Sequence, residues 1–224
     1  MITLLELFHW SQLFQPQFYI EHGGLWLLLF VVFAETGLFF GFFLPGDSLL
    51  FVAGIYSVPL ASQIFVSNNE WMNLSILFAF ISAAGIIGNY VGYLIGKNVG
   101  PAMYDWKDNL LFKKKYLIQA QDFYEKHGGR AIVIARFIPI VRTFAPIVAG
   151  IVGMDKKKFV YFNVIGCLTW VASMLCAGHF LQSWILNQYH FDLKNHLEII
   201  VLGIVFFTTA PVIFKVITHQ PKKS

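Results

Sequence analysis

The segment from Gly128 to Met154, GGRAIVIARFIPIVRTFAPIVAGIVGM, constrains the fold of this chain more than any other. It is strongly apolar, yet it contains Arg136 and Arg142, and two prolines interrupt it. An arginine at the centre of a bilayer costs roughly 2.5–3.5 kcal/mol on insertion scales. Two buried arginines therefore need an anionic partner, a water-filled cavity or a bound phosphate.

The prolines in this segment, Pro139 and Pro146, predict a broken helix. Each lacks a backbone donor and clashes with the preceding turn, so both cannot lie inside one straight helix. Only about ten apolar residues flank Pro139 on each side, whereas a membrane span needs roughly 20. The sequence therefore predicts a re-entrant hairpin over residues 129–154, with the two prolines at its tip and its irregular backbone lining a cavity.

Composition places the whole chain in a membrane. Hydrophobic residues make up 57% of it and charged residues 12%, against roughly 25% charged residues in a soluble domain. All 16 Lys and Arg residues lie from Lys97 onward, whereas residues 1–96 carry only acidic charges. Basic residues that cluster beside apolar segments mark membrane topology and argue against a nucleic-acid partner. We predict one integral membrane domain over residues 1–224.

A further hairpin is predicted earlier in the chain, over residues 25–60. Its first arm is apolar apart from Glu35 and the threonine that follows it, and the arm stops at Pro45-Gly46. Pro-Gly followed by Asp is a turn and helix-start signal, because the Asp47 carboxylate can cap the free amides of the returning helix. Pro45 and Gly46 are then the tip of this hairpin, and Glu35 is buried in its first arm.

The remaining segments predict an all-α chain with a defined topology. Residues 74–96 form a fuller span that leads to the first basic cluster, and the amphipathic stretch 98–126 follows on the membrane surface. By the positive-inside rule this side is cytoplasmic, and the later basic clusters fall on the same side. The C-terminus is then cytoplasmic and the N-terminus periplasmic. The other predicted elements are an interfacial helix within residues 1–22 and spans over residues 159–186 and 199–217.

The two hairpins belong to a predicted inverted repeat. EHGG, residues 21–24, precedes the first hairpin, and KHGG, residues 126–129, precedes the second. The first hairpin enters from outside and the second from the cytoplasm, so the repeats, residues 23–97 and 127–218, have opposite orientations. In transporters, such repeats place broken helices and buried charges at a substrate site near the bilayer midplane.

Two longer motifs resemble the signatures of the DedA family, in the VTT-domain superfamily. The first is FFGFFLPGDSLL, residues 39–50, and the second is RFIPIVRTFAP, residues 136–146. YFNVIG, residues 161–166, resembles the family's segment downstream of the second signature. The resemblance covers about residues 20–185. It implies two re-entrant hairpins that face each other, flanked by transmembrane helices.

The resemblance also implies a function. Members of the family are implicated in moving lipid carriers across the bacterial inner membrane, undecaprenyl phosphate above all, and in resistance that depends on the proton motive force. Some relatives handle phosphatidylethanolamine, and distant eukaryotic ones scramble phospholipids. The family's functional residues correspond here to Glu35, Asp47, Arg136 and Arg142. The chain departs from the family at Asn89, where many members have Asp, and this argues against a third acidic proton site.

The arginines predict a site for a lipid phosphate. A guanidinium holds phosphate oxygens through paired, charge-assisted hydrogen bonds, so Arg136 and Arg142 are the predicted substrate-binding residues. Ser48 and Thr143 are expected to donate hydrogen bonds to the same head group. The predicted partner is therefore a membrane lipid, a polyprenyl phosphate or a phospholipid.

The two acids have more than one interpretation. Burial in an apolar helix favours the neutral form of Glu35, which makes it the candidate for proton coupling. Asp47 either shares that role or simply caps its helix. Both acids can instead neutralise the arginines as structural ion pairs, and pairing and substrate contact can alternate during transport. Asn163 and Trp170 are interpreted as packing and interface residues.

The leading functional prediction is a multi-pass lipid translocase of the bacterial inner membrane, with homo-oligomer formation left open. A lipid phosphatase would need a nucleophile or a metal cluster. The sequence has no His-Glu-x-x-His and no acids at metal-ligand spacing, so we expect no catalytic residues, no metal and no cofactor. A proton-driven antiporter of small cations or drugs, and a scramblase of phospholipids such as phosphatidylethanolamine, are the alternatives.

Overall fold

The computed structural model describes residues 16–38, 44, 46–105, 114–189, 193 and 203. Every regular element in these residues is a helix, as the sequence predicts. Three predictions fall outside this part of the chain. They concern most of the interfacial N-terminal helix, Pro45 at the tip of the first hairpin, and the last span over residues 199–217, of which only Gly203 is described.

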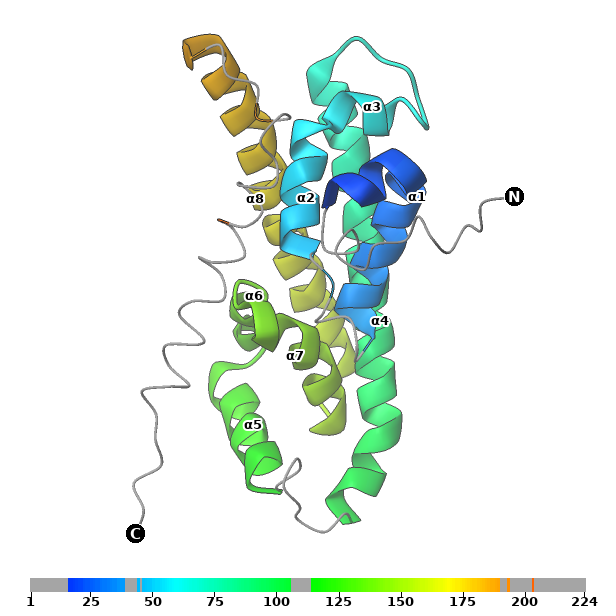
Figure 1. Cartoon of the computed structure of the whole chain (residues 1–224). Coiled ribbons are helices and arrows are strands. Elements are labelled where there is room, and N and C mark those ends of the chain that lie inside the picture. Colours follow the sequence, from blue (N-terminus) through cyan, green and yellow to red (C-terminus); the bar gives the residue numbers. More distant parts are fainter. Residues whose placement is uncertain are drawn as a thin grey trace, which may run out of the picture.

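Two long helices, α4 (Glu70–Asp105) and α8 (Lys156–Tyr189), form the frame of the molecule and lie side by side in Figure 1. Their apolar parts, Glu70–Gly100 and Lys156–Tyr189, contain 31 and 34 residues. With a rise of about 1.5 Å per residue, each exceeds the roughly 30 Å of a bilayer's hydrocarbon core. Both helices are therefore long and apolar enough to cross a membrane, and they include the predicted spans 74–96 and 159–186.

The first hairpin consists of two helices, and a short third helix follows it: α1 (Pro16–Gly37), α2 (Gly46–Ile55) and α3 (Ser57–Ala61). Pro16 suits the first turn of α1, where its missing N–H would have no helical partner. The helix kinks at Gly24, whose φ of 54° favours glycine. The next residue, Leu25, donates its backbone N–H to the side chain of Gln63 at 2.9 Å, which ties the kink to the end of the hairpin.

The second hairpin is broken where Pro139 predicts it. It consists of α6 (Arg130–Ala135) and α7 (Pro139–Ile151), and the helix α5 (Lys114–His127) precedes it. Ile138 is extended, and α7 starts at Pro139, so no continuous helix runs through this proline. Pro146 lies inside α7, and its assignment to the hairpin tip is therefore wrong. The helix continues past it and loses only the hydrogen bond that the Arg142 carbonyl would otherwise accept.

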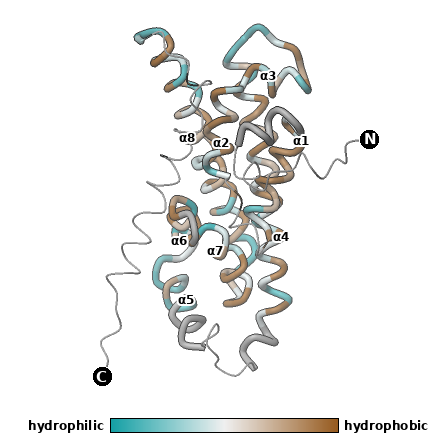
Figure 2. Tube along the Cα trace, viewed as in Figure 1, coloured by the Kyte–Doolittle hydropathy of each residue, from teal (hydrophilic) through white to brown (hydrophobic). Residues whose placement is uncertain are grey.

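The two hairpins cover different halves of the α4–α8 pair. In Figure 1, α1, α2 and α3 lie along one half, and α5, α6 and α7 lie along the other. Apolar residues dominate α1, α2 and α4 in Figure 2. The backbones of α4 and α7 come close because Gly96 and Gly150 have no side chains. A Cβ at either position would collide with the facing helix. The end of α1 and the starts of α2 and α7 meet near the middle of the molecule, where Arg142 contacts Glu35 and Asp47.

Candidate functional site

One arginine joins the two hairpins where they meet. Arg142 lies in the first turn of α7, Glu35 in the last turn of α1 and Asp47 in the first turn of α2. The two Nη atoms of Arg142 donate to the two acids, one to Glu35 Oε1 and one to Asp47 Oδ1. The Glu35 side chain is 2% exposed and that of Arg142 7%. These three residues, the ion-pair cluster, therefore connect the hairpins inside the protein.

Trp170, from the middle of α8, supports the ion-pair cluster. Its indole Nε1 donates to Asp47 Oδ1 at 2.9 Å, so this carboxylate oxygen accepts from both Trp170 and Arg142. The guanidinium carbons of Arg142 and Arg136 lie 4.9 and 5.5 Å from the centroid of the Trp170 ring. At these distances the ring attracts both cations.

Arg136 occupies a neutral polar environment beside the ion-pair cluster. It follows the last residue of α6, and its side chain is buried. Its Nη2 donates to Asn163 Oδ1 at 3.3 Å, and Asn163 Nδ2 donates to the Ile86 carbonyl at 3.1 Å. The Asn89 side chain contacts Asn163 and turns its amide oxygen toward Arg136. Among the described residues, no carboxylate pairs with Arg136.

Both arginines keep an unused donor. Arg136 Nη1 and Arg142 Nε are buried and have no hydrogen-bond partner among the described residues. Leaving a buried donor unpaired costs about 1–3 kcal/mol, and more on a charged group. Two arginines and two acids give the site a formal charge of zero. The pairing is uneven, however, because Arg142 binds both acids and Arg136 binds only amides.

The remaining predicted residues lie around this site. Ser48 is buried in the first turn of α2, and Thr143 is buried next to Arg142 in α7. Asp47 points its carboxylate at Arg142 and Trp170. Gly46, at the start of α2, packs against the Glu35 carboxylate so closely that a Cβ would overlap it. The described residues contain no group of three His, Cys, Asp or Glu side chains that could hold a metal ion.

Sequence reasoning missed the roles of Trp170 and Asn163, which are part of the site rather than packing residues. The sequence does contain a signal that could have placed both residues in the site. The two residues are seven positions apart, about two helical turns, so they share one face of α8. Each carries a polar group inside an apolar helix, and such a group needs a buried partner.

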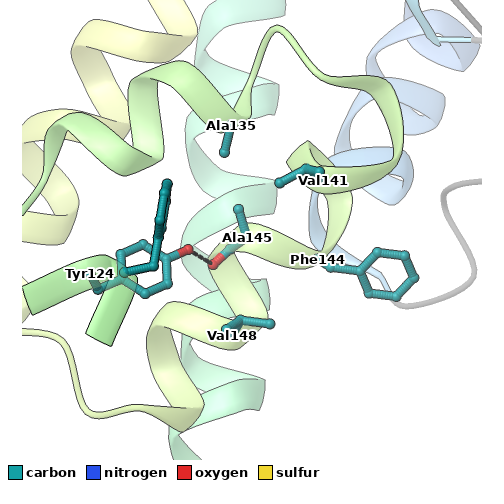
Figure 3. Close-up of a pocket in the computed structure, with 7 residues that line it drawn as sticks. Tyr124, Ala135, Val141, Phe144, Ala145 and Val148 are labelled. Atoms are coloured by element: carbon teal, nitrogen blue, oxygen red, sulfur yellow. Dashed lines mark hydrogen bonds between the residues drawn. The ribbon is translucent and has the colours of Figure 1, made fainter. Parts of the chain in front are cut away.

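An apolar cavity of about 300 Å³ lies between α5, α6 and α7 (Figure 3). Its lining residues are Phe123, Tyr124, Ala135, Val141, Phe144, Ala145 and Val148. Tyr124 donates its hydroxyl to the Ala145 carbonyl at 2.9 Å. Burial raises the pKa of this hydroxyl, which therefore stays protonated and serves as a donor. The contact fastens α5 to α7 at one side of the cavity.

Comparisons with known proteins relate the chain to membrane proteins. Residues 44–180 match the VTT domain. The chain is 38% identical to Protein DedA of Escherichia coli K12 over 204 residues, which cover 90% of this chain and 87% of the relative. It is 36% identical to an uncharacterized membrane protein of Mycobacterium tuberculosis H37Rv, over 82% of this chain and 74% of that protein.

A more distant relative is the Inner membrane protein YqjA of Escherichia coli K12, with 30% identity over 84% of this chain and 82% of the relative. No solved structure matches the chain. The VTT match includes Asp47, both arginines and Trp170, and the alignment to Protein DedA covers nine-tenths of the chain. The chain therefore belongs to the DedA family of VTT-domain membrane proteins.

Proposed function

We propose that this protein is a translocase that moves a lipid by its phosphate head group across the bacterial inner membrane, with undecaprenyl phosphate as the first candidate. The observation that carries the proposal is the uneven pairing of two buried arginines. Arg142 binds two acids, whereas Arg136 binds neutral amides and keeps an unpaired Nη1. A phosphate would supply both the missing acceptor and the missing negative charge.

Head-group binding and the ion-pair cluster would then compete for Arg142. Both guanidinium groups lie by the ring of Trp170, so a phosphate bound at Arg136 has Arg142 as its nearest further cation. When Arg142 turns to the phosphate, Asp47 keeps its hydrogen bond from Trp170, whereas Glu35 loses its arginine partner. A proton on Glu35 removes the uncompensated charge. Glu35 is therefore the acid that couples transport to protons.

The proposed transport path needs two hairpins that enter the membrane without crossing it. The returning helices are short, with 10 residues in α2 and 13 in α7. They extend about 15 and 20 Å, less than the roughly 30 Å of the hydrocarbon core. The contact of Arg142 with Glu35 and Asp47 joins the two hairpin ends. These lengths and this contact support a re-entrant arrangement with the charged residues near the midplane.

Lipid retention tests the proposal. Purified wild-type protein and the Arg136→Gln variant are compared by mass spectrometry of the lipids that remain bound. Losing charge-assisted hydrogen bonds worth about 1.5–3 kcal/mol predicts a loss of roughly 10- to 100-fold in retained phosphate lipid. Arg130→Gln is the matched control, because Arg130 begins the same helix and is exposed.

Retention by Arg136→Gln at the wild-type level would refute the assignment of the head group to Arg136. A second assay follows translocation of a fluorescent lipid phosphate in liposomes with an imposed pH gradient. Proton flux that needs no phosphate lipid would instead favour the antiporter. Release of free phosphate would favour a lipid phosphatase.

A further inference from the structure

We propose that the apolar cavity between α5, α6 and α7 receives the hydrocarbon chain of the lipid whose phosphate binds at the arginines. This inference rests on the proposed function, because it assigns a second part of the same ligand. Two of the lining residues are sequence neighbours of the two arginines. Ala135 and Val141, which line the cavity, immediately precede Arg136 and Arg142 in the chain.

The faces of α7 explain this arrangement. Val141, Ala145 and Val148 recur at helical spacing and face the cavity (Figure 3), whereas Arg142 points to the acids of the first hairpin. α7 thus separates a charged face from an apolar one. A lipid whose head group is at the arginines can reach the cavity by passing around the α6–α7 turn.

The surface of that turn is suited to a hydrocarbon chain. Three consecutive positions before Pro139 are Arg136, Phe137 and Ile138, and the last two are half-exposed apolar side chains. Val141, at the rim of the cavity, is also exposed. The turn between the end of α6 and the cavity therefore exposes apolar side chains, along which the hydrocarbon chain would run.

The chemistry and size of the cavity favour a hydrocarbon chain over a peptide. Its lining is apolar except for Tyr124, whose hydroxyl already donates to Ala145. A peptide backbone would find no free partner on these side chains. A helix is about 10–12 Å across, so a single turn with side chains needs more than the volume of about 300 Å³ available. If one chain carbon takes up about the volume of a water molecule, roughly 30 Å³, the cavity holds roughly ten chain carbons.

The cavity would direct the chain rather than strengthen binding. A chain that leaves the bilayer for an apolar cavity gains little hydrophobic free energy, because lipid tails are already apolar. The head group therefore supplies the affinity, and the cavity sets the direction of the tail. Tail occupancy should consequently depend on a phosphate bound at the arginines.

Photolabelling of the protein in nanodiscs tests the inference. The probe is a long-chain alkyl phosphate with a diazirine in its chain, and the control probe is the matching neutral alcohol. We expect the phosphate probe to label peptides that contain Phe123 and Val148 several-fold more than the alcohol does. Val148→Trp fills the cavity and should remove this labelling while phosphate-lipid retention stays at the wild-type level. Ile87→Trp, on the exposed side of α4, is the matched control and should label as wild type.

Equal labelling by the phosphate and the alcohol would overturn the inference, because the cavity would then be filled by bulk lipid. Absence of labelling from both probes would also overturn it and would indicate that another segment of this chain or a second copy occupies the site. If Val148→Trp does not fold, Val148→Phe replaces it as the cavity-filling variant. The comparison of the phosphate probe with the alcohol probe on the wild-type protein also tests whether the tail occupies the cavity. A loss of lipid retention in Arg136→Gln without any change in tail labelling would spare the proposed function and refute only the tail path.

Discussion

Replacement of Trp170 by phenylalanine tests whether the indole N–H holds the site together. Its bond to Asp47 Oδ1 at 2.9 Å joins a donor to a partly buried carboxylate, and such bonds contribute about 1.5–3 kcal/mol. Phenylalanine keeps an aromatic face near both arginines, so much of the cation–π attraction remains. We expect Trp170→Phe to lower the free energy of unfolding by about 2–4 kcal/mol, which includes the volume lost from a fully buried side chain.

A double-mutant cycle with Asp47→Ala separates the hydrogen bond from the lost volume. Reversible unfolding in mixed detergent micelles gives the free energies of the wild type, the two single variants and the double variant. A coupling energy of about 1.5 kcal/mol or more is expected, because either single change already removes the bond. Trp184→Phe, at an exposed position of the same helix, should change stability by less than about 0.5 kcal/mol. Additivity of the Trp170 and Asp47 changes within about 0.5 kcal/mol would refute the reasoning.

Two further substitutions probe the close contact at Gly46 and the hydroxyl of Tyr124. Gly46→Ala places a methyl group where the Glu35 carboxylate lies, so we expect a loss of about 1–3 kcal/mol in the same unfolding assay, and unchanged stability would contradict the close contact. Tyr124→Phe should remove part of the pH dependence of the free energy of unfolding. Burial raises the pKa of the folded hydroxyl above its ordinary value of 10.0, so its contribution is complete below that pH and is lost as the pH rises through the folded pKa. Wild-type stability should therefore fall at alkaline pH relative to Tyr124→Phe, and parallel curves would count against a buried Tyr124.

Covalent geometry made part of this fold predictable. The break before Pro139 follows from the missing N–H and the ring of proline, and the long apolar runs in α4 and α8 follow from their composition. Pro146 has the same ring, yet it lies inside α7. Its surroundings tolerate one lost hydrogen bond, and neighbouring residues in the sequence do not reveal this.

The partners in the site could be predicted only as types of residue. Sequence patterns indicated two buried arginines and two acids, but the distribution of charge depends on how the hairpins approach each other. Arg142 takes both acids and Arg136 takes two asparagines, because α7 meets the first hairpin whereas the end of α6 faces α4 and α8. Trp170 donates to Asp47, which lies more than 100 residues earlier in the sequence, and no local pattern encodes this contact.

Equal numbers of cations and acids in the site have an electrical consequence. On the proposed mechanism, a monoanionic head group and one proton enter together, and the loaded site stays neutral. A charge that crosses the bilayer gains or loses about 2.3 kcal/mol per 100 mV, whereas a neutral complex feels no such force. Movement would then follow the difference in proton concentration across the membrane and would be nearly indifferent to its voltage.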